Sequence, residues 1–195
     1  MVHHEGLLEL DAIYLFEASP QISAYREQPL TLRYPDGPRL RRYTPDFELT
    51  LSNGDCVLVE VKPLSSLADE TVRHKLDRVR MHLQRSDQCF LVLDDNTLRM
   101  EPRQANLRQI YHRAPRIRQP ISAYKAALDR HAFRFPLPIS SASTLFLDRG
   151  VEPYSMLLAG LLRCDLDQPI LPETPLHITR EEDDAWFRIA PRHDF

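Results

Sequence analysis

Residues 43–63 read YTPDFELTLSNGDCVLVEVKP, and this stretch decides the fold. Residues 40–51 have the composition of a strand that is broken near Pro45, and residues 56–61 form a short apolar run suited to a buried strand. Asn53-Gly54 lies between the two and is typical of a type I′ hairpin turn. Pro63 ends the second strand. The stretch therefore predicts an antiparallel β-hairpin.

Two carboxylates and a lysine meet on this hairpin. Counting outward from the turn, adjacent antiparallel strands bring Asp46 and Glu60 to neighbouring places. Glu60 and Lys62 are two positions apart and share one face of a strand, whereas Val61 between them points into the core. We therefore expect an acid-acid-lysine set at the end of apolar strands.

Hydrolysis of a phosphodiester needs this combination, because the charge that develops on the phosphate must be neutralised. Mg²⁺ prefers a few carboxylates and keeps several waters, so Asp46 and Glu60 are its expected ligands, with the backbone carbonyl of Val61. Mn²⁺ is expected to substitute for it. Lys62 is suited to position or deprotonate the attacking water. The alternative is that Glu60 and Lys62 form a surface ion pair on an edge strand without a catalytic role. Charges in so apolar a run, however, cost stability unless they are paired or bind an ion.

A third carboxylate is expected from the first predicted helix. Residues 5–17 place Leu8, Ala12, Leu15 and Phe16 on one helical stripe. Glu9 lies in the middle of that helix and is the preferred candidate for the site, and Glu5, one turn earlier on the same face, is its rival.

The order of predicted elements up to residue 113 is that of an α/β core with helices around a sheet. The predicted elements are a helix at 5–17, strands at 22–27, 30–34, 40–51 and 56–61, a helix at about 67–85, a strand at 89–93 and a helix at 102–113.

A short, basic, proline-bounded segment at 114–120 predicts a linker between an N-terminal domain at 1–113 and a second domain at 121–180. Three helices at about 121–132, 141–148 and 152–163, with a short hairpin at 165–178, suggest a small, mainly helical, winged-helix-like module. Residues 181–195 are expected to form an acidic tail.

Charge is unevenly distributed along the chain, although its formal net value is only -3. Residues 99–134 contain nine Lys or Arg and two acids, and residues 165–195 contain eight acids and three arginines. A basic middle is typical of a surface that meets phosphates, and equally of a solvated helix face. Further candidates for contact with a DNA backbone lie on the 67–85 helix and before Pro29: Arg73, Lys75, Arg78, Arg80 and Gln28. For these the alternatives are a solvated helix face and a plain turn residue.

The composition excludes several classes of protein. No apolar run approaches the roughly 20 residues of a membrane helix, and the first residues lack the apolar core of a secretory signal. Cys56, Cys89 and Cys164 have no metal-binding spacing, so a reducing cytoplasm is the expected location and a zinc site is not expected.

Several pieces of the sequence, in the right order, resemble TnsA, the endonuclease subunit of heteromeric bacterial transposases. These pieces are Leu8-Glu9, Tyr25-Arg26-Glu27-Gln28-Pro29, Tyr43-Thr44-Pro45-Asp46-Phe47, Glu60-Val61-Lys62-Pro63, Leu98-Arg99, Asn106-Leu107 and Gly160-Leu161-Leu162-Arg163-Cys164-Asp165-Leu166. The resemblance implies a restriction-endonuclease-like PD-(D/E)xK fold and a catalytic set of Glu9, Asp46, Glu60 and Lys62.

It further implies a DNA endonuclease that cuts the 5′ (non-transferred) strands at transposon ends. The implied partners are double-stranded DNA, a DDE transposase subunit similar to TnsB and an AAA+ regulator similar to TnsC. No association with a membrane is expected. A bacterial cytoplasmic location, associated with the nucleoid when active, is implied too. Two other hypotheses stay open: a stand-alone restriction or repair nuclease with the same core, and a non-catalytic DNA-binding or scaffold subunit. The intact acid-acid-lysine set argues against the last.

Overall fold

A computed structural model of the protein describes residues 4–180 and 186–190. The described residues divide into two compact units: residues 4–16 with 21–100 form the first, and residues 17–20 with the described residues after 100 form the second. This division differs from the linker expected at 114–120. The helix α5 (Arg103–Arg113) belongs with the second unit, where it packs against α8 (Pro153–Leu158).

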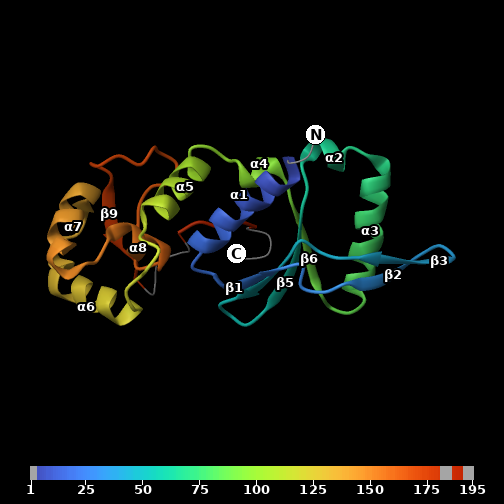
Figure 1. Ribbon diagram of the computed structural model, residues 1–195, viewed down its shortest axis with the longest axis horizontal. Helices are drawn as coiled ribbons and strands as arrows, with labels where there is room; N and C mark the ends of the chain where they lie inside the picture. The colour runs from blue at the N-terminus through green and yellow to red at the C-terminus, as the bar shows by residue number, and fades with distance from the viewer. Residues whose placement is uncertain (1–3, 181–185, 191–195) are drawn as a thin grey trace. The chain divides into compact units, whose positions relative to one another are not determined.

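The first unit is built on a mixed four-stranded sheet with the order β1-β4-β5-β6 (Figure 1). Strands β1, β4 and β5 are antiparallel, and β6 runs parallel to β5. A parallel neighbour requires a crossover, which α2 and α3 supply. The elements of this unit are α1 (His4–Ala18), β1 (Ile22–Glu27), β2 (Leu32–Asp36), β3 (Arg39–Tyr43), β4 (Phe47–Leu51), β5 (Cys56–Val61), α2 (Leu64–Leu67), α3 (Glu70–Gln84), β6 (Cys89–Leu93) and α4 (Asp95–Leu98).

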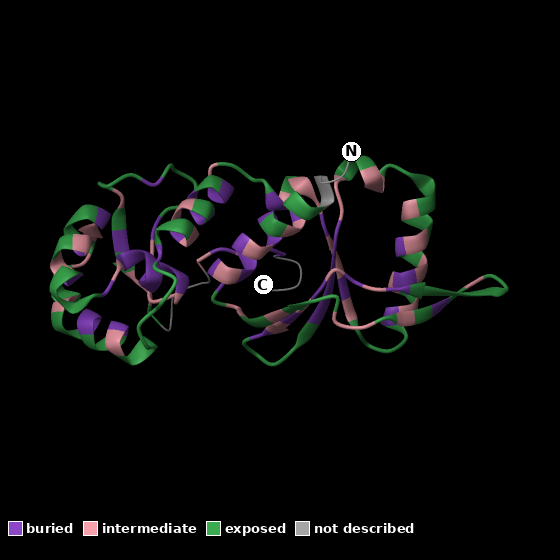
Figure 2. Ribbon diagram, in the orientation of Figure 1, coloured by how far each residue is buried: buried purple, intermediate pink, exposed green. Residues whose placement is uncertain are grey.

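The two faces of the sheet are covered by different elements. On one face, Phe16 of α1 meets Phe47 of β4 edge to face, with ring centroids 5.3 Å apart. On the other face, Leu58 and Phe90 join α3 and the β2–β3 hairpin in a buried cluster. Because side chains alternate along a strand, Glu60 lies on the same face as Leu58. Five of the six residues of β5 are buried (Figure 2).

The predicted elements of this unit are confirmed, with three corrections. The strand expected at 40–51 is two strands, β3 and β4, which belong to different sheets. The β4–β5 turn is not type I′: of its two central candidates only Gly54 has a positive φ, at 92°. The Gly54 N–H donates to the Leu51 carbonyl and the Leu51 N–H to the Asp55 carbonyl, as in a three-residue loop with glycine at the left-handed position. The long helix begins at Glu70 rather than near 67, because the Asp69 carboxylate accepts hydrogen bonds from the N–H groups of Thr71 and Val72 and caps it.

The second unit combines helices with a small three-stranded sheet of order β7-β9-β8. Its elements are α5, α6 (Ile121–His131), η1 (Ala132–Arg134), β7 (Leu137–Pro138), α7 (Ile139–Phe146), η2 (Leu147–Arg149), α8, β8 (Leu162–Arg163) and β9 (Pro175–Ile178). Helix α8 stops before the expected 163, because Gly160 adopts φ 67° and ends it. The hairpin expected within 165–178 is wrong, since β9 pairs with β7 and β8 instead. The winged-helix description stays a prediction.

Asn106 on α5 holds the loop that precedes β9. Its side chain is 3% exposed, and its Nδ2 donates to the carbonyls of Leu166 (2.9 Å) and Gln168 (2.8 Å). Its Oδ1 accepts from the N–H of Ile170 at 3.0 Å. The amide therefore satisfies three backbone groups that helix and sheet do not.

Replacing Asn106 with Ala is expected to lower the free energy of unfolding by about 2–4 kcal/mol, because buried backbone groups lose their partners. Thermal or urea unfolding would measure the loss, and Asn96→Ala, at an exposed position of α4, is the control. Equal stability of the two variants would contradict a structural role for the Asn106 amide.

No helix among the described residues has the length and apolar character needed to span a bilayer. Of the expected acidic tail, residues 181–185 and 191–195 lie outside the described residues. Between them, Trp186 donates from Nε1 to the carbonyl of Cys164 at 2.7 Å, and Phe187 is buried.

Candidate active site

Asp46 is fixed at the start of β4 by contacts from two neighbouring strands. Its Oδ2 accepts from the backbone N–H of Val61 at 2.8 Å, and its backbone carbonyl accepts from the N–H of Gln28 at 2.8 Å. Gln28 reaches this carbonyl with a left-handed backbone, φ 43°. The Asp46 side chain keeps 19% of its surface exposed. One carboxylate oxygen is thus committed to the backbone, and Oδ1 has no hydrogen bond within the described part of the chain.

Glu60 is the buried carboxylate of the pair. It is 2% exposed, and its Oε2 accepts a short hydrogen bond from the Tyr43 hydroxyl. The register places Phe47 opposite Val59, so Asp46 and Glu60 are the next neighbours along the same two strands, as predicted. Burial raises the pKa of Glu60, and the negative charge of Asp46 raises it further. The Tyr43 hydroxyl and the cations of Lys62 and Lys75 act in the opposite direction.

Lys62 brings a positive charge to both carboxylates. Its Nζ lies 3.4 Å from Glu60 Oε1 and 3.9 Å from Asp46 Oδ2, and its side chain is 15% exposed. Its backbone N–H donates to the carbonyl of Leu93, which continues the β5–β6 ladder past the end of β5. The structure therefore brings together three of the four predicted site residues.

Tyr43 and Lys75 also belong to this site, and the sequence did not single out either role. The ring of Tyr43 is 4% exposed, and Lys75 Nζ lies 5.1 Å from its centroid. Burial and the negative charge of Glu60 raise the pKa of the Tyr43 hydroxyl, so it remains a hydrogen-bond donor. The available signal was the tyrosine three residues before Asp46, because a buried hydroxyl needs a partner.

Glu9 is the fourth predicted site residue. It lies half-buried on α1, the helix that packs through Phe16 on the opposite face of the sheet. Within the ranges 4–180 and 186–190, no group of three or more His, Cys, Asp or Glu side chains is placed to hold a metal ion. The side chain of Glu5 lies outside the described residues. The choice between the two stays a prediction.

The basic residues predicted to track DNA make contacts within the protein. Lys75 lies over Tyr43, and Arg78 donates to the carbonyl of Pro35 at 3.2 Å. Arg80 pairs with Asp77 at 3.2 Å, and Arg73 lies 4.0 Å from Glu70, each one helical turn away. Such exposed pairs contribute little to stability, so Arg73 and Arg80 stay predictions for DNA contact, while Lys75 faces the candidate site.

Glu60→Gln is expected to stabilise the metal-free protein at neutral pH. Because the pKa of Glu60 is raised on folding, its favourable contribution is present at low pH and is lost as pH rises through the folded-state pKa. The amide keeps an acceptor for Tyr43 and removes the buried charge. We expect a gain of about 0.5–2 kcal/mol at pH 7.5, the usual range for a stabilising substitution.

Thermal unfolding in EDTA at pH 7.5 and pH 4 would measure this effect, and the gain should shrink at the lower pH. Glu48→Gln is the matched control, because Glu48 lies on β4 and pairs with Arg26 at 2.8 Å. A melting temperature of Glu60→Gln at or below that of the unaltered protein at pH 7.5 would contradict the expectation.

A segment of the chain is similar to a known protein family. Residues 19–95 match the model described as TnsA-like endonuclease N terminal, which is less than half of the chain. None of the curated proteins compared with this sequence matches it. The predicted resemblance to a TnsA-like nuclease and the restriction-endonuclease-like fold of the first unit are confirmed. The matched segment contains Asp46, Glu60 and Lys62 and excludes Glu9.

Proposed function

We propose that this protein, whose residues 19–95 match a TnsA-like nuclease domain, is a Mg²⁺-dependent DNA endonuclease that acts through Asp46, Glu60 and Lys62. The observation that supports this most is the approach of Lys62 Nζ to both carboxylates, within 3.9 Å, on adjacent strands of the matched segment. A lone ion pair on an edge strand would be exposed, whereas Glu60 is buried.

The donors at this site suit a hard divalent cation. Asp46 Oδ1 has no hydrogen bond within residues 4–180 and 186–190, and buried Glu60 gains from a nearby positive charge. Mg²⁺ is commonly held by one or two carboxylates with its remaining places filled by water, and Mn²⁺ accepts similar ligands. We propose Asp46, Glu60 and the Val61 carbonyl as ligands, with Glu9 as a further acid from α1.

The contacts of the side chains support the roles that we propose for them. A bound cation would neutralise charge on the phosphodiester as it is attacked. Lys62, poised between the two carboxylates, is placed to position the attacking water and to stabilise charge on the phosphate. The Val61 N–H orients Asp46, and the Tyr43 hydroxyl orients Glu60, so both carboxylates are held before a ligand arrives.

We further propose that the substrate is double-stranded DNA at transposon ends, cut on the 5′ (non-transferred) strands. The partners proposed with it are a DDE transposase similar to TnsB and an AAA+ regulator similar to TnsC, in the bacterial cytoplasm. The match to the TnsA-like endonuclease domain supports this assembly.

A nicking assay on supercoiled plasmid carrying candidate transposon ends tests the proposal, with Mg²⁺, Mn²⁺ or EDTA and with or without the partner transposase. Metal-dependent nicking that requires the partner is the expected result. Robust nicking by the lone chain would favour a stand-alone nuclease, and no nicking in any arm would overturn the proposal.

Metal binding can be tested without cleavage. Millimolar Mg²⁺ or Mn²⁺ should raise the melting temperature of the unaltered protein, because a ligand that binds the folded state stabilises it. The same addition should leave Asp46→Asn unchanged. An equal shift for both proteins would place the bound metal elsewhere.

A further inference from the structure

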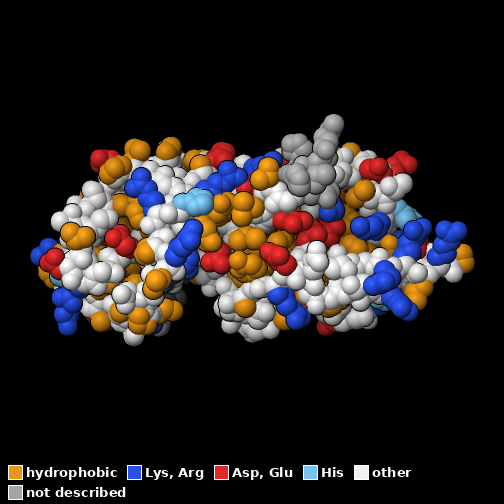
Figure 3. Space-filling model, viewed as in Figure 1, with side chains coloured by type: hydrophobic (Ala, Val, Ile, Leu, Met, Phe, Trp, Pro, Cys, Tyr) orange, Lys and Arg blue, Asp and Glu red, His pale blue; other side chains and the backbone are white. Residues whose placement is uncertain are grey.

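The β2–β3 hairpin is strongly basic. Four arginines lie on it, all exposed, against a single acid, Asp36. The arginines are Arg33, Arg39, Arg41 and Arg42. In Figure 3, Lys and Arg side chains gather over the part of the first unit where Figure 1 places β2, β3 and α3.

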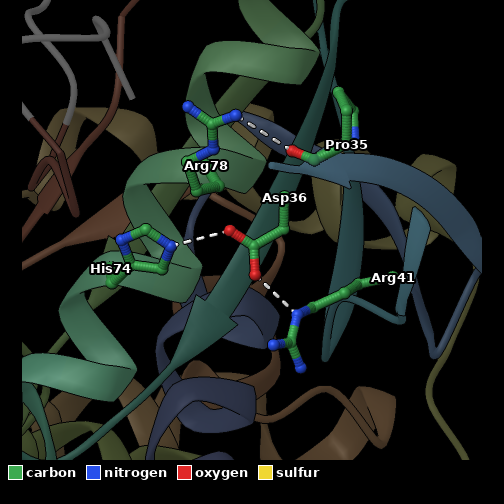
Figure 4. Close-up of polar contacts among 5 residues, drawn as sticks. All are labelled: Pro35, Asp36, Arg41, His74 and Arg78. Atoms are coloured by element: carbon green, nitrogen blue, oxygen red, sulfur yellow. Dashed lines mark hydrogen bonds and ion pairs between the residues drawn. The ribbon is translucent and has the colours of Figure 1, made fainter. Parts of the chain in front are cut away.

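The inner face of this hairpin is anchored on the first unit. Tyr34 and Tyr43 lie in the buried cluster with Leu76 and Val79 of α3. At the turn end of the hairpin, Asp36 Oδ1 lies 2.8 Å from His74 Nε2, and Asp36 Oδ2 accepts from Arg41 Nε at 2.6 Å (Figure 4).

These contacts pair the only carboxylate of the hairpin, Asp36, with His74 and Arg41. The hydrogen bonds from His74 and Arg41 hold the pKa of Asp36 below its usual range, so the carboxylate stays ionised and partnered. Arg78 adds a hydrogen bond to the Pro35 carbonyl at 3.2 Å, again from α3 (Figure 4). The hairpin is therefore held on α3, with no acid left to neutralise its outer face.

The outer face carries an unusual pair. Arg33 of β2 lies directly opposite Arg42 of β3, so the two side chains share a face. Both are exposed, and neither makes an ion pair or hydrogen bond within the described residues. Like charges directly opposite each other destabilise a strand pair. An anionic partner that bridges the two guanidinium groups would remove this cost.

The pair is close to the candidate site along the chain. Arg42 precedes Tyr43, which donates to Glu60, and only three residues separate Arg42 from Asp46. Four residues span at most about 14 Å, which corresponds to about four base pairs at 3.4 Å each along a duplex. A phosphate bound at this pair would therefore belong to the same duplex that Asp46 and Glu60 would cut.

We propose that the outer face of the β2–β3 hairpin binds the sugar-phosphate backbone of duplex DNA beside the cleavage site, through Arg33 and Arg42. This inference rests on the proposed nuclease function and names a surface that holds its substrate. Guanidinium groups suit the task because their forked donors match phosphate oxygens two at a time. Contacts of this kind orient the duplex and do not read its sequence.

The test is fluorescence anisotropy of the full chain with a labelled duplex of about 20 base pairs, in EDTA, from about 50 to 300 mM NaCl. Arg33→Ala/Arg42→Ala should weaken binding roughly 10- to 100-fold near 0.1 M salt, and should reduce the slope of log K against log salt by about 2. Arg33→Lys/Arg42→Lys should keep most of the slope. The matched control, Arg26→Ala/Arg85→Ala, removes two exposed arginines of the same unit outside the hairpin and should change the slope less.

Melting temperatures show whether the variants fold. Removing the opposed charges of Arg33 and Arg42 should leave the melting temperature equal to that of wild type or slightly higher. Binding by Arg33→Ala/Arg42→Ala that equals wild type, or no saturable binding by wild type, would overturn the inference. The inference would also be overturned if Arg33→Ala/Arg42→Ala bound DNA normally but no longer assembled with a protein partner. Reduced binding by that variant, in a protein that never nicks DNA, would retain the surface and reject the nuclease proposal. If Arg33→Ala/Arg42→Ala binds DNA like wild type and nicks it, the binding surface is rejected and the nuclease proposal is retained.

Discussion

Asp46→Asn is expected to lower the rate of Mg²⁺-dependent DNA nicking by about 1,000-fold without unfolding the protein. The amide oxygen can still accept from the Val61 N–H, so the local backbone is retained. The lost charge is the one proposed to hold the metal. A bound cation supplies several kcal/mol of charge stabilisation, and about 4 kcal/mol corresponds to a factor of 1,000 in rate.

The matched control is Glu48→Gln, two residues along the same strand and on the same face, where Glu48 pairs with Arg26. It should nick at nearly the unaltered rate in the assembled complex. Nicking by Asp46→Asn within a factor of ten of wild type, with Mg²⁺ and partners present, would remove Asp46 from the metal site. Far-ultraviolet circular dichroism of both variants checks that the fold is kept.

Lys62→Ala is expected to reduce nicking by about 100- to 10,000-fold, the range of a positioned proton-transfer group. The lysine is the cation that lies between Glu60 and Asp46, so its loss also leaves two neighbouring carboxylates without compensation. We therefore expect lower stability in EDTA above the carboxyl pKa range, and partial recovery of that stability when Mg²⁺ is added.

Lys125→Ala, which removes an exposed lysine from α6 in the other unit, controls for the loss of charge alone. A pH-rate profile separates the two roles of Lys62. If it acts on the attacking water, Lys62→Ala should lose or shift the limb of the profile that belongs to the lysine. A rate that falls by less than tenfold would show that Lys62 is not needed for the chemistry.

The sequence predicted much of the first unit because its signals are local. The bounds expected for the strands at 22–27, 56–61 and 89–93 are those observed. Pro or Gly residues flank the first two strands, and the third is a short apolar run between polar residues. Counting outward from the Asn53-Gly54 turn placed Asp46 near Glu60, but the turn type decided the exact register. The observed three-residue loop puts Phe47 opposite Val59 and Asp46 next to Glu60, whereas a two-residue turn at 53–54 would have put Asp46 opposite Val61.

The second unit was harder to predict, because its short strands pair over long separations. Strand β9 pairs with β7 and β8, and nothing in their two- and four-residue segments identifies a partner. The end of α8 depended on whether Gly160 would adopt a left-handed backbone, which glycine does easily. A side chain at this position would also be crowded, because a Cβ there would lie 3.1 Å from the Cβ of Pro20.

By itself, the sequence determined the acid-acid-lysine set, because strand alternation and a short hairpin bring Asp46, Glu60 and Lys62 together within one local unit. The tertiary structure alone decided which groups surround that set. Packing of α3 and the β2–β3 hairpin on the sheet brought Tyr43 to Glu60 and Lys75 to Tyr43. The same packing joined Asp36 to His74, 38 residues apart, which fixed the basic hairpin beside the site. No periodicity encodes such contacts, because they depend on how separate elements share one buried core.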